Sequence, residues 1–486
     1  MKNAVRFIAL AVLGFFSIDV ALTPIAHADE LNWTWNNGGD KVTWQDCNNW
    51  NPATTPGPAN PDDNVNIAIG SYDTTMDIAG LKIRDLTFTA GQGNKTLTLT
   101  EDLTTSFINR TKFVGSDYYN VGWDFIDIDK SAGAVSHDIN LNGHSLTIEP
   151  ANTAHNPSVG YCDVSIFNGN ITGQGSIIIN NADSATANRV VYFERLGNQP
   201  PMQIDADIKV QTDYLMLSNT KITGDVTQTG GSISNGHRPG MLSTIIGKVT
   251  LSGGQFCNGD YGHGKIVGDV TLNDGYFHNG FKGTGDITGN VTLNGSGKFY
   301  NGNDNGSTGT VTGDITLNDD GEFNNGYNAD STGNITGNIA LNAGSDFYNG
   351  RNGTGKINGN ITLDGGGLVN GDMSGSTGNI IGNITQNSGA VFAGFNTGSI
   401  SNITGNITLK NGSFFNGDLG TSYITGNIMQ YDGKFVNGHI GASVGNITGN
   451  ITQNAGEFYN GYEGTGTIKG NVTVHDGDFY NGYNSD

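Results

Sequence analysis

A unit of about 22 residues repeats from residue 222 to 486, and this repeat restricts the fold more than any other feature. Its first half has the pattern I-T-G-N-I-T-L-N and its second half the pattern G-x-F-Y-N-G, as in Gly297–Gly302. The central glycine of the first half recurs at intervals of 21 to 24 residues, at Gly224, Gly247, Gly268, Gly289, Gly313, Gly337, Gly359, Gly382, Gly405, Gly426, Gly449 and Gly470. A period of this length predicts a solenoid, a propeller or an array of small units.

Within the first half of the unit, apolar and polar residues alternate, which predicts a half-buried strand. No segment of the unit has helical spacing, and a propeller blade needs about 40 residues and four strands. The repeat therefore predicts an all-β fold, a parallel β-solenoid (β-helix) with one coil of about 22 residues per unit. Because stacked strands lie about 4.8 Å apart, twelve coils would form a rod of roughly 55–60 Å.

Corresponding residues of successive coils should stack into columns. The Ile or Val two residues after the glycine is expected inside. A phenylalanine column is expected to pack against it: Phe256, Phe277, Phe299, Phe323, Phe347, Phe392, Phe414, Phe435, Phe458 and Phe479, with Leu368 as the single exception. The glycine predicts a bend or a close backbone approach. The asparagine of F-x-N-G is expected to form a hydrogen-bonded ladder along the stack.

The N-terminal part of the chain differs from the repeat. Lys2 and Arg6, an apolar run and Ala26-His27-Ala28 predict a signal peptide over residues 1–28, and hence a secreted, extracellular or cell-surface protein. Residues 29–70 contain four of the five tryptophans and are expected to cap the first coil, with a carbohydrate site as the alternative. Residues 71–221 predict an irregular solenoid and residues 222–486 a regular one.

Composition limits the partners. The formal net charge of −22 argues against nucleic acid, which requires a basic surface, and disfavours an anionic membrane. After removal of the signal peptide no membrane span is expected. Three cysteines are too few for a disulfide scaffold, although a Cys47–Cys162 bridge remains open. Cys257 occupies a position filled elsewhere by Tyr, His, Val or Asn, so we expect it to point outward.

No catalytic, cofactor-binding or metal-binding residues are predicted. Gly262-His263-Gly264 is similar to the G-H-G triplet of polygalacturonases, but the aspartates and the basic residue of that family are not evident nearby. Asp225, Asp269 and Asp314 share a column with Asn290 and are expected on a solvated face. We therefore expect a protein that is not an enzyme.

Two surface features suggest ligands. Thr288, Asn290 and Thr292 belong to a regular threonine array, which is compatible with an ice-binding surface or simply with strand propensity. The tyrosines beside the N-G turn are the candidate glycan contacts, and covering of the strand edge is the alternative. They are Tyr300, Tyr348, Tyr459 and Tyr480 before the turn, and Tyr327, Tyr462 and Tyr483 after it.

The opening W-x-W…W-x-D-x-x-N-W-N-P pattern (residues 33–52) and the Gly/Asn/Thr-rich coils resemble bacterial autotransporter-like and filamentous haemagglutinin-type adhesins. The resemblance implies a secreted or cell-surface structural protein whose partners are glycans or a host or neighbouring cell surface. The chain departs from the autotransporter pattern in one respect, since no C-terminal translocator barrel is evident in its sequence. A carbohydrate-active β-helix (lyase or hydrolase) is the alternative function, and ice binding the third. The final coil carries no evident cap, which predicts either a longer chain or end-to-end self-association.

Overall fold

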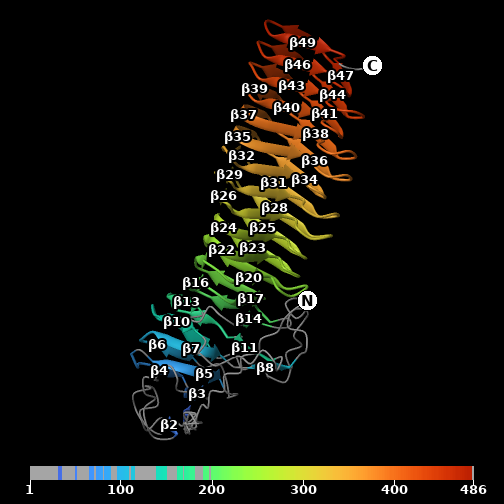
Figure 1. The fold of residues 1–486 in the computed structure, drawn as a ribbon. Helices are drawn as coiled ribbons and strands as arrows, with labels where there is room; N and C mark the ends of the chain where they lie inside the picture. Colours follow the sequence, from blue (N-terminus) through green and yellow to red (C-terminus); the bar gives the residue numbers. More distant parts are fainter. Residues whose placement is uncertain are drawn as a thin grey trace, which may run out of the picture.

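The computed structural model describes residues 199–483 without a gap and shorter stretches between residues 31 and 195. It confirms a parallel β-solenoid of about 14 turns, with about 23 residues in each coil and no helix in the described residues. The coils stack into an elongated rod, which runs from β3 (Val65–Ile69) to β49 (Asp478–Asn481) in Figure 1.

Each regular coil contains three short strands in succession. The first strands form one sheet: β4 (Thr74–Met76), β6 (Thr96–Leu99), β9 (Asp138–Asn140), β12 (Ile171–Thr172), β15 (Met202–Ile204), β18 (Thr220–Thr223), β21 (Leu242–Ile246), β23 (His263–Val267), β25 (Thr284–Thr288), β28 (Thr308–Thr312), β31 (Thr332–Thr336), β34 (Thr354–Asn358), β36 (Thr377–Ile381), β38 (Ile400–Thr404), β41 (Thr421–Thr425), β44 (Val444–Thr448) and β47 (Thr465–Lys469).

The second strands follow a corner and stack in a second layer: β1 (Leu31–Trp35), β3, β5 (Lys82–Phe88), β7 (Leu103–Ile108), β10 (Ser145–Ile148), β13 (Ser176–Ile179), β16 (Asp207–Val210), β19 (Val226–Gln228), β26 (Val291–Leu293), β29 (Ile315–Leu317), β32 (Ile339–Leu341), β39 (Ile407–Leu409), β42 (Ile428–Gln430), β45 (Ile451–Gln453) and β48 (Val472–Val474).

The third strands are β8 (Thr111–Val114), β11 (Tyr161–Phe167), β14 (Val190–Glu194), β17 (Tyr214–Ser218), β20 (Ser232–Asn235), β27 (Lys298–Asn301), β30 (Glu322–Asn325), β33 (Asp346–Asn349), β40 (Ser413–Asn416), β43 (Lys434–Asn437), β46 (Glu457–Asn460) and β49. Second and third strands are continuous in β22 (Val249–Asn258), β24 (Val270–Asn279), β35 (Ile361–Asn370) and β37 (Ile384–Ala393). Among the described strands, β1 with β2 (Trp50–Asn51) and β8 with β11 are the antiparallel pairs.

The I-T-G-N-I-T-L-N segment forms two strands joined by a corner. The prediction of a single strand from the alternation was therefore wrong. In β25 and β26 the Gly289-Asn290 pair separates strands of two different sheets. In ten of the twelve coils this glycine has φ between +149° and +158°, a region that disfavours other residues. A Cβ at Gly337 would lie 2.1 Å from the carbonyl oxygen of Gly313. The glycine therefore allows backbones of adjacent coils to approach at the corner.

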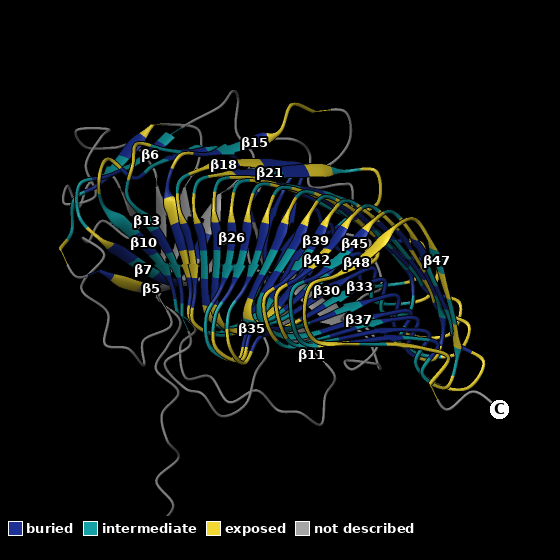
Figure 2. Ribbon diagram, turned by 90° about the horizontal axis from the view of Figure 1, so that it is seen from above, coloured by how far each residue is buried: buried dark blue, intermediate teal, exposed yellow. Residues whose placement is uncertain are grey.

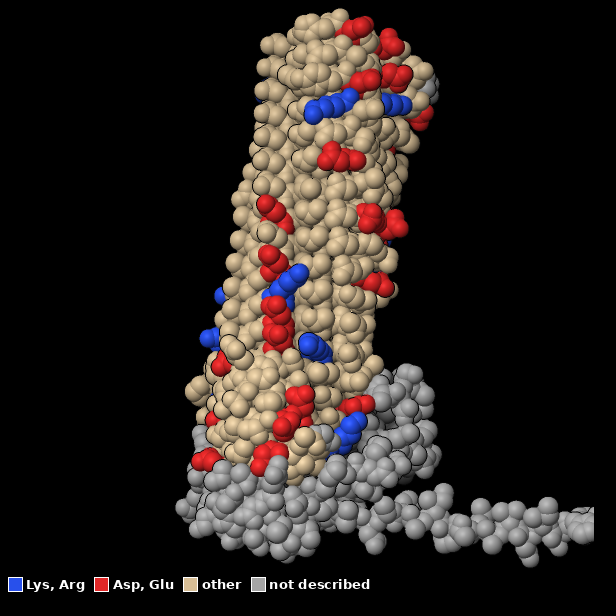
Figure 3. All heavy atoms as spheres, turned by 90° about the vertical axis from the view of Figure 1, so that its left-hand side faces the viewer, with Lys and Arg blue, Asp and Glu red and all other residues tan. Residues whose placement is uncertain are grey.

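The residue after this glycine has a structural role as well as an exposed position. From Asp207 to Asn450, nearly every Asp or Asn at this corner accepts the backbone N–H of the equivalent residue in the next coil, at 2.8–3.1 Å. Its side-chain oxygen replaces the strand hydrogen bonds that are lost where the chain turns. Uncharged residues cover most of the side of the rod that Figure 3 shows, and charged side chains are scattered over it.

The interior is a continuous apolar stack (Figure 2). Phenylalanine rings from Phe256 to Phe347 lie 4.6–4.9 Å apart and within 9° of parallel. The column assignment of Phe392 was wrong: Val391 pairs with Leu368 and Phe414 in the interior, whereas Phe392 points outward. The phenylalanine column thus has two exceptions. Both neighbours are apolar, so hydrophobicity alone did not distinguish them.

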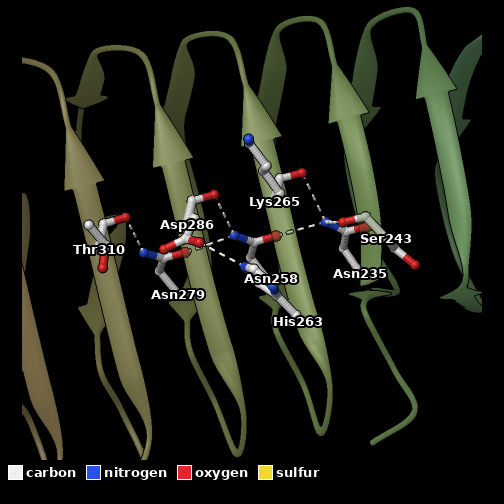
Figure 4. A network of polar contacts seen from close by, with 8 residues as sticks. All are labelled: Asn235, Ser243, Asn258, His263, Lys265, Asn279, Asp286 and Thr310. Carbon is white, nitrogen blue, oxygen red and sulfur yellow. Dashed lines mark hydrogen bonds and ion pairs between the residues drawn. The ribbon is translucent and has the colours of Figure 1, made fainter. Parts of the chain in front are cut away.

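The predicted asparagine ladder is present, and its rungs are buried up to Asn437. Each Nδ2 donates to the Oδ1 of the next rung at 2.6–2.8 Å, from Asn235 to Asn370 and again from Asn416 to Asn481. Most rungs also donate to a backbone carbonyl of a first strand, as Asn258 does to Asp286 at 3.2 Å (Figure 4). Buried amides need such partners, since an unpaired one costs about 1–3 kcal/mol.

Ala393 interrupts the ladder, and a second exception in the same coil compensates for it. Asn370 Nδ2 donates instead to Ser401 Oγ at 2.6 Å. Most coils have glycine at the position of Ser401, as at Gly378, where a Cβ would lie 2.3 Å from Asn370 Oδ1, and the next coil has Ser422. Ser401 thus supplies the acceptor for Asn370 that Ala393 lacks.

We expect Ala393→Asn and Ser401→Gly to be strongly coupled. Ser401→Gly alone should destabilise the rod by about 1–2 kcal/mol, since Asn370 loses its acceptor. Ala393→Asn supplies an acceptor for Asn370 again and a donor for Asn416 Oδ1, which has no partner, so the double variant should restore the ladder and be more stable than Ser401→Gly alone. Urea midpoints of the four proteins test this, and additive shifts would contradict it.

Several expectations lie outside the described residues: the signal peptide, the tryptophan packing of the cap, and the Cys47–Cys162 bridge. Cys257 was expected to point outward, but its side chain is fully buried. In the part of the chain that the structure describes, no helix has the length and apolarity needed to cross a membrane.

Candidate ligand-binding face

One side of the rod contains most of the aromatic residues outside the core, and we call it the variable face. It consists of three columns of residues on and after the third strands. The first column precedes the inner phenylalanine: Ser232, Gln255, Tyr276, Lys298, Glu322, Asp346, Gly367, Ala390, Ser413, Lys434, Glu457 and Asp478.

The second column follows the inner phenylalanine: Ser234, Cys257, His278, Tyr300, Asn324, Tyr348, Val369, Phe392, Phe415, Val436, Tyr459 and Tyr480. The third column follows the Asn-Gly turn: His237, Asp260, Phe281, Asn303, Tyr327, Arg351, Asp372, Phe395, Asp418, His439, Tyr462 and Tyr483. Third-column side chains pack over the second column, which is why Cys257 is buried.

All of the predicted glycan-contact tyrosines lie on this face, in two groups. Tyr327 contacts Tyr300 edge-on, with ring centroids 4.8 Å apart, and Tyr348 lies close by. In the second group, Tyr459 stacks on Tyr480 at 4.8 Å and meets Tyr462 edge-on. Tyr480 and Tyr483 are 36% and 39% exposed, and the inner-column residues Val472 and Val474 of the same coil, on which no further coil stacks, are exposed as well.

Ring stacking determines what these tyrosines can offer a ligand. His278 on Tyr300, Phe392 on Phe415 and Tyr459 on Tyr480 are all within 11° of parallel, so their faces are used within the rod. Burial and a 3.0 Å hydrogen bond to Glu457 raise the pKa of Tyr459 to about 12, which keeps this hydroxyl a neutral donor.

A charged network that sequence reasoning missed lies beside the first group. Glu322 accepts from Lys298 at 2.9 Å and from Arg351 at 2.7 Å. Burial alone would raise the pKa of Glu322, but the hydrogen bonds from Asn324 and Lys298 outweigh burial and lower it. The two basic residues are 24 and 29 positions away from Glu322 and become its neighbours only through the coil register.

Basic side chains of the rod also cover its own aromatic rings. Arg351 Cζ lies 4.5 Å from the centroid of Tyr348 and 5.3 Å from that of Tyr327. Lys434 Nζ lies 4.9 Å from Tyr459 and 5.1 Å from Tyr462. Such cation–π contacts stabilise partly buried sites by about 0.5–2 kcal/mol each.

The other candidate features of the sequence have structural explanations. His263 Nε2 pairs with Asp286 Oδ2 at 2.7 Å, and burial lowers the pKa of His278 to about 4. Thr288 and Thr292 lie in different sheets on either side of a corner, so the array is not one flat face. Among the described residues, no group of three His, Cys, Asp or Glu side chains could hold a metal ion.

The fold and this face define the protein as an all-β, parallel β-solenoid repeat protein with a constant frame and one aromatic and charged side. The chain matches no family model, no curated protein and no solved structure.

Proposed function

We propose that the protein is a secreted or cell-surface rod of adhesin type, without catalytic activity, which binds a ligand through the variable face. The observation that carries this proposal is the contrast between columns. Interior, corner and ladder positions repeat almost without change, whereas aromatic and charged residues alternate along the variable face. A rigid frame that displays variable side chains suits recognition.

The ligand class that we favour is a glycan or another exposed component of a host or neighbouring cell surface. The partly exposed Tyr480 and Tyr483 of the second group offer hydroxyl groups next to apolar ring surface, which suits sugars. The net charge of −22 disfavours strongly anionic polymers. Export is supported by the predicted signal peptide.

A glycan array and a cell-binding assay with the labelled full chain test the proposal. We expect binding without turnover, and a loss of roughly tenfold or more when Tyr480 and Tyr483 are both changed to Ser. Thr336→Ala, on the first strands away from this face, is the matched control and should bind normally. Release of shortened saccharides by purified protein would favour the lyase or hydrolase alternative, and equal binding by all variants would exclude this face.

A further inference from the structure

The second column of the variable face has three gaps where a short side chain stands between two rings. Asn324 lies between Tyr300 and Tyr348, Val369 between Tyr348 and Phe392, and Val436 between Phe415 and Tyr459; this follows from strand register. Two strand spacings separate the rings on either side, about 9.6 Å, which leaves room for one flat group between them.

Two of these gaps are covered by basic side chains of the rod. Arg351 donates to Asn324 Oδ1 at 2.9 Å while its guanidinium lies over Tyr348. Lys434 lies two residues before Val436 and reaches over Tyr459. Asn324 and Val436 are consequently 0% exposed.

The third gap has no basic side chain over it, because Phe395, which packs edge-on against Phe392 with ring centroids 5.2 Å apart, stands where Arg351 stands at the first gap. Val369 remains partly exposed, unlike its two counterparts. The residue that corresponds to Lys434 in this coil is Gly367, which has no side chain to place over the gap. The gap at Val369, which we call the slot, is thus bordered by Tyr348, Phe392 and Phe395 and has the partly exposed Val369 at its base.

Carboxylates border this slot. Asp346 Oδ1 lies 2.7 Å from the position that a Cβ on Gly367 would take, beside the floor. Asp372, which is 6% exposed, follows the turn of the same coil, accepts from Asn396 and lies 3.8 Å from Arg351 Nε. Burial raises the pKa of both carboxyl groups, so an additional cation would compensate for their lost hydration.

We propose that the slot between Tyr348 and Phe392 binds the guanidinium group of an arginine side chain from a partner protein. A guanidinium is flat, stacks on aromatic rings and pairs with carboxylates, and Arg351 shows this arrangement one gap away. The acidic rod attracts basic partners from a distance. The biological setting of this contact rests on the proposed binding function.

The test uses the full chain and three blocked peptides of the form Gly-X-Gly, in which X is arginine, lysine or the neutral isostere citrulline. Gly367→Lys places a lysine two residues before Val369, as Lys434 is two residues before Val436. The new side chain should occupy the slot and exclude the peptide. The backbone of Gly367 is outside the left-handed region, and the close neighbour of a Cβ there is the flexible carboxylate of Asp346. Gly367→Ala is the matched control, because it leaves the slot open.

Titration by NMR or calorimetry should show the arginine peptide binding to the wild type and to Gly367→Ala. Binding to Gly367→Lys should be at least roughly tenfold weaker, the lysine peptide should bind less tightly than the arginine peptide, and the citrulline peptide should not compete.

Equal binding to both Gly367 variants, or binding of the citrulline peptide as tight as that of the arginine peptide, would overturn the assignment. If a glucosamine oligomer binds in the slot and the arginine peptide does not, the assignment to an arginine side chain is overturned, and the ligand of the slot is an amino sugar. Cell binding that is unaffected by Gly367→Lys would overturn the inference alone, whereas peptide binding without any cell or glycan binding would overturn the proposed function alone.

Discussion

Ile361→Asp should unfold the coils around it, at a cost of more than about 5 kcal/mol. Ile361 is 0% exposed and pairs with Ile339 and Ile384 in the adjacent coils, so the carboxylate would be surrounded by apolar side chains. The substitution loses the packing of a buried isoleucine, about 2–5 kcal/mol, and adds the cost of an unpaired buried charge.

Thr362→Asp is the matched control for this prediction. Thr362 lies next in the same strand but points outward, between Ala340 and Thr385, so a carboxylate there stays hydrated. We expect a change below about 1 kcal/mol. Thermal unfolding followed by circular dichroism compares the two variants, and equal shifts would contradict the assignment of inner and outer faces.

Gly337→Ala should destabilise the rod by roughly 3–5 kcal/mol, because the new Cβ would collide with the backbone of the adjacent coil. It would lie 2.1 Å from the carbonyl oxygen and 2.5 Å from the carbonyl carbon of Gly313, and φ is +152°. Both contacts are with backbone, so relief requires the coils to separate and lengthens the hydrogen bonds on either side of the corner.

Gly306→Ala separates the two causes of that cost. Gly306 also has positive φ, +72°, but a Cβ there would meet nothing within 4 Å. We expect Gly306→Ala to lower the free energy of unfolding by about 1–2 kcal/mol, through backbone strain alone. The difference between the two urea midpoints measures the close approach of coils, and its absence would mean that the glycine is kept only for its φ.

The coil, its interior columns and the ladder were predictable from the sequence because each repeats with the structural period. The corner was not, because apolar and polar residues alternate through Gly289-Asn290 as they would along one strand. Phe392 was misassigned by one residue, since Val391 and Phe392 are both apolar and only the alignment of Ala393 with the ladder distinguishes them.

The candidate site was predictable only in part. The tyrosines stand out because they recur beside the same turn. The pairing of Glu322 with Lys298 and Arg351, and the open slot at Val369, depend on which residues become neighbours across coils. These contacts are set by register and side-chain length, which a repeat pattern does not specify.

The asparagine ladder gives the rod a direction. Strand hydrogen bonds in a parallel sheet alternate in sense, so their dipoles largely cancel. The side-chain amides from Asn235 to Asn370 do not alternate, because each donates toward the C-terminal side. Amide dipoles of about 3.5 D aligned head to tail add together, as they do along a helix. The molecule is therefore an electrical dipole along its long axis as well as a net anion, and two rods lying side by side lower their dipolar energy when they run in opposite directions.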